Sequence, residues 1–192
     1  MLIAYKAFDK DLKCRGYQFK LNEWNTEEYA QCVKSGLHCA TNPLDCLTYY
    51  SNFETSRLFI VACAGDIHED GSDSKVSCTK MKLLKELNLI EFVAVSMQYI
   101  LDHPKLKMNN KVYTDFNNGQ INNGFVIVRG KNPKAKAPVS SVVGLIQENE
   151  NNIEIKKMKI FKIDGTKYKE NVIYDISERE YVTYDMNEKE VE

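Results

Sequence analysis

The stretch GLHCATNPLDCLTYY, residues 36–50, combines a glycine turn, a histidine, a helix start and a pair of tyrosines. Asn42 before Pro43 favours a helix start, because the asparagine side chain accepts an orphan backbone N–H and proline has no donor to lose there. The apolar positions that follow recur on one helical face. The stretch therefore predicts a turn, a short extended piece and a short helix, which together bring His38 close to the two tyrosines.

The composition is that of a soluble globular protein, with 43% hydrophobic and 28% charged residues among 192. A formal net charge of -1 supplies no overall field that would attract nucleic acid or an anionic membrane. No apolar run is long enough to span a bilayer, and the N-terminus has no secretory pattern. We therefore expect a cytoplasmic protein, in whose compartment thiols stay reduced.

All six cysteines lie within the first 78 residues, and none forms the close pair that structural zinc sites usually supply. Cys32, Cys39 and Cys46 recur every seven residues, but the turn and helix start between them interrupt any helical register. We expect small buried hydrophobic side chains and no metal site.

The rest of the chain predicts two domains joined by a connector. The apolar run 57–64 and the alternating run 75–83 predict strands, and Asn88 is expected to cap a helix that ends at His103. Asparagine and glycine are concentrated in residues 106–124, which predicts turns with little to bury.

We accordingly predict an α+β protein, with a mixed β-sheet and two helices in the N-terminal domain, followed by a small C-terminal β-meander. The predicted segments are an N-terminal domain over 1–105, a connector over 106–124, a β-module over 125–185 and an acidic tail over 186–192.

Three motifs carry a resemblance to a known family: YKAFDKDLKCRG at 5–16, the stretch 36–50, and DSKV at 73–76. Together they resemble an uncharacterised phage and prophage family. In many of its members a glycine-rich repeat array precedes a closing β-segment similar to residues 130–137 and 161–165. The resemblance implies a mobile-element origin and action in the cytoplasm of a host cell. The family supplies no established activity.

The first functional hypothesis is a phage-type protein that binds a host macromolecule without turnover, for example as an anti-CRISPR-like inhibitor of a host defence system. The expected partner is a host protein, such as a defence effector, and not a membrane or nucleic acid. No phosphate loop, Ser-His-Asp arrangement or His-Glu-x-x-His motif is present to indicate catalysis. This hypothesis requires no cofactor.

A second, local resemblance is to the ADP-ribosyltransferase pattern, in which a Gly-x-aromatic-x-Ala strand precedes a helix whose serine and tyrosine bracket nicotinamide. Residues 36–40, followed by Thr48 and Tyr49, are similar to it. The resemblance implies NAD as cofactor and Glu86 as the distal catalytic carboxylate. Tyr5 and Lys6 stand where a histidine or arginine belongs. The alternative is therefore an ADP-ribosyltransferase-like enzyme or an inactive relative that binds NAD or another nucleotide.

The expected site includes a glycine turn, a capped helix and the first strand, whose polar-tipped side chains would lie near one another. Its predicted ligand- or partner-binding residues are Tyr5, His38, Tyr49 and Tyr50. The competing reading is structural, with His38 hydrogen-bonded beside a turn and the tyrosines divided between core and surface. A predicted basic loop supplies a secondary patch, which consists of Arg129, Lys131, Lys134 and Lys136. Since no aromatic residues alternate with these cations, we expect a solvated face.

Overall fold

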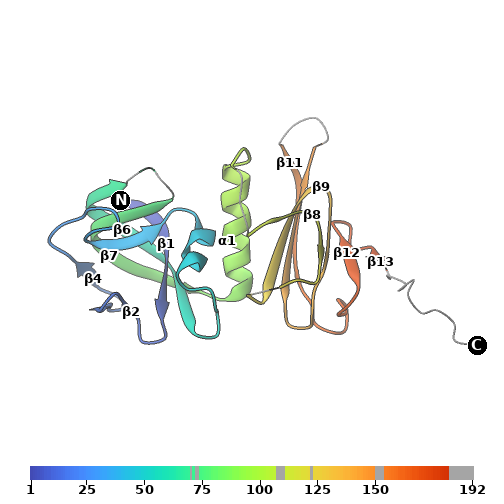
Figure 1. Cartoon of the computed structure of the whole chain (residues 1–192), viewed down its shortest axis with the longest axis horizontal. Helices are drawn as coiled ribbons and strands as arrows, with labels where there is room; N and C mark the ends of the chain where they lie inside the picture. Colours follow the sequence, from blue (N-terminus) through green and yellow to red (C-terminus); the bar gives the residue numbers. More distant parts are fainter. Residues whose placement is uncertain (70, 72–73, 107–110, 122, 150–153, 182–192) are drawn as a thin grey trace, which may run out of the picture. The chain divides into compact units, whose positions relative to one another are not determined.

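The computed structural model describes residues 1–69, 71, 74–106, 111–121, 123–149 and 154–181. The chain divides into two compact units, Met1–Asp102 and His103–Glu192, and each has its own sheet (Figure 1). Within the described residues, neither helix has the combination of length and apolar character that crossing a membrane requires.

The first unit is built on one antiparallel sheet whose strand order is β4-β7-β5-β1-β6, with a further pairing between β7 and β6. That pairing joins β1, β5, β7 and β6 into a closed ring. The strands are β1 (Leu2–Asp9), β4 (Trp24–Thr26), β5 (Leu37–Ala40), β6 (Ser56–Glu69) and β7 (Lys75–Leu87), and the hairpin β2 (Lys13–Cys14) with β3 (Tyr17–Gln18) forms a separate two-stranded sheet.

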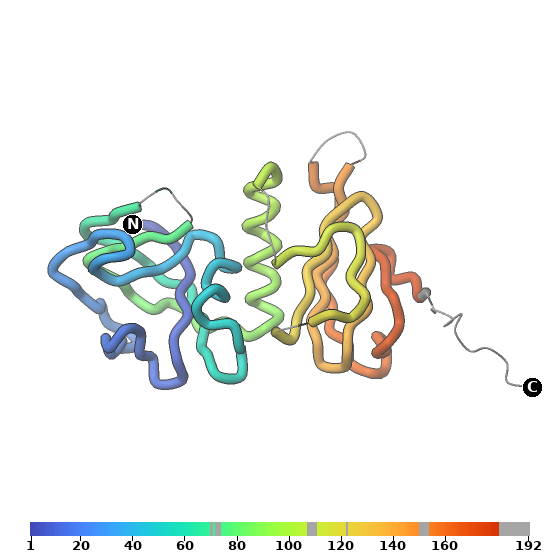
Figure 2. Tube along the Cα trace, in the orientation of Figure 1, coloured from blue at the N-terminus to red at the C-terminus, as the bar shows by residue number. Residues whose placement is uncertain are grey.

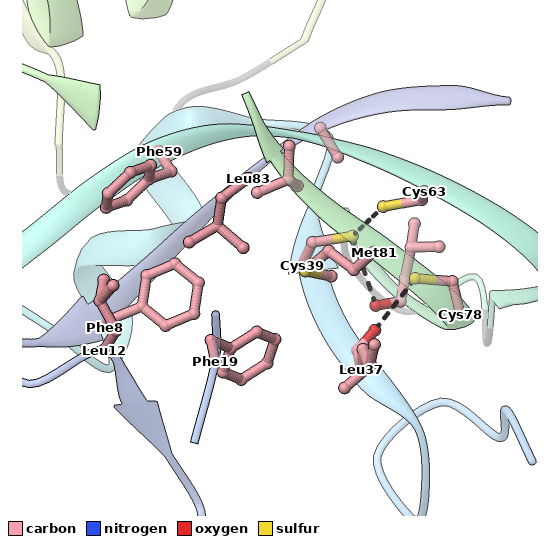
Figure 3. Close-up of a cluster of buried hydrophobic side chains, with 13 residues drawn as sticks. Phe8, Leu12, Phe19, Leu37, Cys39, Phe59, Cys63, Cys78, Met81 and Leu83 are labelled. Carbon is pink, nitrogen blue, oxygen red and sulfur yellow. Dashed lines mark hydrogen bonds between the residues drawn. The ribbon is translucent and has the colours of Figure 1, made fainter. Parts of the chain in front are cut away.

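The interior of this ring is the main core of the first unit (Figure 3). Alternate residues of each strand point inward, as the two-residue period of a strand requires. On β1, for example, Ala4 and Phe8 are fully buried, and the Phe8 ring packs edge-on against Phe19 and Phe59. Elsewhere in the first unit Leu47, Phe92 and Val93 are buried, and on β6 Val61 is buried whereas its neighbour Ile60 is only partly buried.

Local sequence signals fix both helices of the first unit. The 3₁₀-helix η1 (Pro43–Thr48) starts where predicted: the Asn42 side chain accepts the Leu44 N–H at 3.1 Å, and Pro43 occupies the first turn. Helix α1 (Leu89–Asp102) starts with a reciprocal cap, in which Asn88 and Glu91 each accept the other's backbone N–H at 3.0 Å.

The second unit contains a six-stranded sheet centred on β9 (Phe125–Lys136). Strands β8 (Tyr113–Asn118) and β10 (Val142–Glu148) both pair with β9 in parallel, and Figure 2 shows the β8 trace running beside β9. The remaining strands are antiparallel to their neighbours: β11 (Ile155–Lys162) on β10, β12 (Ile173–Asp175) on β9, and β13 (Glu180–Tyr181) on β12.

The prediction of an α+β fold was wrong, because the protein is mostly β, with 51% of the described residues in strands and 12% in helices. In the described part of the chain only α1 is an α-helix, since the segment after Asn42 forms six residues of 3₁₀-helix. Strands β6 and β7, with 14 and 13 residues, extend beyond the sequence runs 57–64 and 75–83 that predicted them. Because the added residues are largely exposed, their hydrophobicity did not indicate a strand. They are strand residues nevertheless, because the pairing of β6 with β7 continues along them.

The prediction of a simple C-terminal meander was also wrong, because β9 pairs in parallel with β10 and with β8. The predicted basic loop lies inside β9, and the predicted connector 106–124 contains β8. Gly130 permits this arrangement, since a Cβ there would lie 2.0 Å from the Asp115 Oδ1 that accepts the Lys131 N–H. Residues 107–110 and 122 of the predicted connector and the predicted tail 186–192 lie outside the described residues.

We expect Phe92→Ala to reduce the free energy of unfolding by about 3–5 kcal/mol, because this fully buried ring leaves a cavity between α1 and the Phe53 ring, which packs edge-on 5.0 Å away. Ile90→Ala on the same helix is the matched control. Ile90 is 46% exposed, and its loss should cost under about 1 kcal/mol. Chemical denaturation measures both, and similar losses for the two variants would contradict the packing described.

Candidate functional site

A pocket of about 850 Å³ opens in the first unit between β1 and β5. We call this weakly paired part of the ring the β1–β5 seam. Strand β1 pairs with β6 at every residue from Leu2 to Asp9, but it pairs with β5 only at Tyr5 and Ala40. Beyond that single pair the two strands separate. The hairpin β2–β3, the residues before β5, and η1 contribute the remaining walls of the pocket.

The structure brings together all four residues predicted to bind a ligand or partner, since Tyr5, His38, Tyr49 and Tyr50 line this one pocket. Thr48 also lines it. The sequence argument placed these residues together through the glycine turn and the helix cap.

Lys6 is a pocket residue that sequence reasoning did not select. Its side chain is only 4% exposed, and its Nζ donates to the His38 carbonyl oxygen at 2.6 Å and contacts Cys14 Sγ at 3.5 Å. The ammonium also lies 5.0 Å from the centroid of the Phe19 ring, within cation–π range. The sequence does contain a signal for it: Lys6 follows the two-residue period of Ala4 and Phe8 along the strand, at a position where a buried apolar residue is expected.

His38 projects from β5 with a half-buried ring. Its Nε2 is the one side-chain nitrogen or oxygen of the described residues that is buried without a hydrogen-bond partner. Burial, and then the charges of Lys6 and Arg15, lower the pKa of His38 below its ordinary value. The ring is therefore neutral at physiological pH, and its Nε2 is available to a ligand.

Tyr5 and Tyr50 present hydroxyl groups that stay protonated. Burial raises the pKa of Tyr5, and burial together with a hydrogen bond to Cys14 raises that of Tyr50. Tyr49 is 60% exposed, and the Lys75 Nζ lies 5.1 Å from its ring centroid. The pocket thus combines aromatic surface with neutral hydrogen-bonding groups and cations.

The pocket rim carries backbone strain at two residues that contact each other. Arg15 and Val33 both have left-handed backbones, with φ of 49° and 72°, and Arg15 Nη1 donates to the Val33 carbonyl at 3.3 Å. A β-branched residue rarely adopts this conformation. Strain of this kind tends to accumulate at ligand-binding sites.

Glu86, the predicted distal carboxylate, does not line the pocket. Both of its carboxylate oxygens accept hydrogen bonds from Arg57, each at 2.7 Å, and this pairing lowers the pKa of Glu86. The carboxylate is therefore already used in a bidentate ion pair on β7.

The secondary basic patch lies in the second unit. Arg129 is paired with Glu148 at 2.6 Å and also donates to the Pro104 carbonyl. Lys131 is exposed, whereas Lys134 and Lys136 are partly buried. The four side chains of the predicted patch therefore lie in different surroundings.

None of the six cysteines, all of which lie in the described residues, forms a disulfide, and three of them meet inside the ring (Figure 3). Cys39 Sγ lies 3.2 Å from Cys63 Sγ, and contact with these thiols and burial raise the pKa of Cys39. Among the described residues, no three His, Cys, Asp or Glu side chains are grouped to hold a metal ion.

Residues 2–95 match the model of a domain of unknown function (DUF7666), and this segment contains the whole pocket. Comparison with curated proteins and with solved structures finds no match. The comparisons therefore relate the first unit to a family without assigning it an activity, and they indicate neither a phage origin nor an ADP-ribosyltransferase-like fold.

We expect Gly36→Ala to destabilise the protein by at least about 1–2 kcal/mol, because φ at this position is +88°. The new Cβ would also lie 2.4 Å from Ser77 Oγ and 2.9 Å from the Tyr29 carbonyl oxygen. Thermal unfolding measures the loss. Gly16→Ala is the control, since φ there is +82° but a Cβ would meet nothing within 4 Å. Equal losses would show that the contacts around Gly36 add nothing to the backbone strain.

His38 should titrate below its ordinary pKa of 6.5. Its folded pKa lies below its unfolded pKa, so falling pH protonates the unfolded chain first, and stability decreases from pH 6.5 down through the folded pKa. An NMR titration of the ring proton gives the midpoint. Between pH 7.5 and 5, His38→Asn should lose less of its melting temperature than the wild type. A midpoint at or above the ordinary value would contradict the burial of the ring.

Proposed function

We propose that this protein acts by binding a host macromolecule through the pocket at the β1–β5 seam, without turnover. The observation that carries the proposal is the buried Nε2 of His38, which has no hydrogen-bond partner among the described residues and lies in a pocket lined by four tyrosines. Aromatic side chains with polar tips offer a large contact area at low entropy cost, which suits recognition.

The proposed setting is the cytoplasm of a host cell, with a host protein as partner. The resemblance of the motifs at 5–16, 36–50 and 73–76 to the phage and prophage family supports it. A protein of this origin that binds without turnover is suited to inhibit a host defence system.

A second candidate, the binding of NAD or another nucleotide, is favoured by the cations and aromatic rings of the same pocket. Transferase chemistry is a less suitable proposal, because Glu86 is bound at both oxygens by Arg57 and does not line the pocket. In calorimetry, NAD that binds with equal affinity to the wild type and to Glu86→Gln would support this candidate.

We expect His38→Ala and Tyr49→Ala to lose the partner while their melting temperatures stay within a few degrees of the wild type. The tagged protein is used to capture partners from bacterial lysate, which are quantified by mass spectrometry. Tyr29→Ala is the control, because Tyr29 is 68% exposed and does not line the pocket. Capture of one set of proteins by all four forms would overturn the proposed site. Unfolding of both pocket variants would show that these residues are structural.

A further inference from the structure

We propose that the pocket accepts an extended acidic peptide, and that a carboxylate of this peptide lies against the Lys6 ammonium. This inference rests on the proposed function, and it names the chemistry of the partner that the same site takes.

Lys6 is a buried cation without an anion. A buried ammonium is costly unless it is paired and hydrogen-bonded. With 4% of its surface exposed, Lys6 contacts a carbonyl oxygen, a thiol and aromatic rings, and no described carboxylate lies within ion-pair distance of it. An ammonium has three donors, and one of them remains for a ligand.

Further cations surround the same cavity. Arg15 and Lys34 line the pocket and form no ion pair with a described residue. The whole lining contains four lysine and arginine side chains and two carboxylates, of which Asp45 already accepts the Ser74 hydroxyl at 2.6 Å. The charge of the cavity therefore complements an anion.

The seam favours an extended chain over a small ion. Beyond Tyr5, no strand of the described residues pairs with β1 on its β5 side. The His38 carbonyl oxygen points toward β1 but is bonded by the Lys6 side chain and not by a strand. An extended peptide entering this gap can bond to the edges of β1 and β5 that are not paired with each other, as in β-augmentation, while its side chains meet the aromatic walls. A free phosphate would use neither the strand edges nor the aromatic walls.

The experiment selects binders from a random octapeptide display library on the full chain. The proposal expects aspartate or glutamate to be enriched at one position of the selected peptides. A synthetic copy of the leading peptide is then compared with the copy in which that acidic residue is replaced by its amide, and the affinity should fall at least tenfold.

Three protein variants test the assignment of the cation. Lys6→Met removes the ammonium while keeping an unbranched side chain only one atom shorter, and it should lower the affinity at least tenfold; Arg15→Gln should lower it several-fold. Lys13→Gln is the matched control on the neighbouring β2, because Lys13 is exposed and outside the pocket; its affinity should stay within twofold. If Lys6→Met does not fold, the exposed Arg15 and the amide peptide decide the question.

The inference is overturned if the selected peptides carry no acidic preference, if Lys6→Met binds them as the wild type does, or if ADP or inorganic phosphate displaces them. Peptides without acidic residues that still require His38 and Tyr49 would leave the proposed binding role intact. Acidic peptides that bind equally well to His38→Ala and Tyr49→Ala would instead contradict the proposed function.

Discussion

The unequal pairing of β1 is the constraint on which the first unit depends. Eight consecutive residue pairs hold β1 to β6, and one pair holds it to β5. The strong side closes the ring, because β6 continues its pairing into β7, and β7 pairs in turn with β5. The weak side leaves room for Lys6 and His38. A fully paired seam would leave no opening between the strands, so that the same departure from regular pairing produces both the cavity and its unusual polar groups.

Short-range signals in the sequence predicted the elements that border the pocket. The order of Asn42 and Pro43 is sufficient to start a helix, since both act on backbone groups within a few residues. Gly36 predicted a turn, and the structure shows why a glycine is needed there: its φ is positive, and Ser77 lies too close for a side chain. The proximity of Tyr5, His38, Tyr49 and Tyr50 follows from these local elements, and the structure places all four around one pocket.

Long-range pairing is what the sequence did not reveal. The parallel pairings of β9 join residues more than ten positions apart in the sequence, and the asparagine-rich β8 has little hydrophobicity to mark it as a strand. Asn117 shows the difficulty. An asparagine usually indicates a turn, yet this one is buried and satisfied, with its side chain bonded to the Gln120 carbonyl and the Gly119 N–H. Composition records neither the partner strand nor these bonds.

Glu86 and Lys6 illustrate opposite uses of charge in this unit. Glu86 is paired with Arg57 in bidentate geometry at the edge of solvent, where such a pair contributes modestly to stability and requires no ligand. Lys6 lies where an alternating strand would place an apolar side chain. In such a position, replacing a buried charge by an apolar residue of similar volume often leaves a protein equally stable or makes it more stable. Its carbonyl, thiol and aromatic contacts reduce the cost of burial without neutralising the charge. The identity of this one side chain is therefore explained better by a ligand than by the fold, and for that reason we centre the proposed site on Lys6 and His38, not on Glu86, the carboxylate that the resemblance implied.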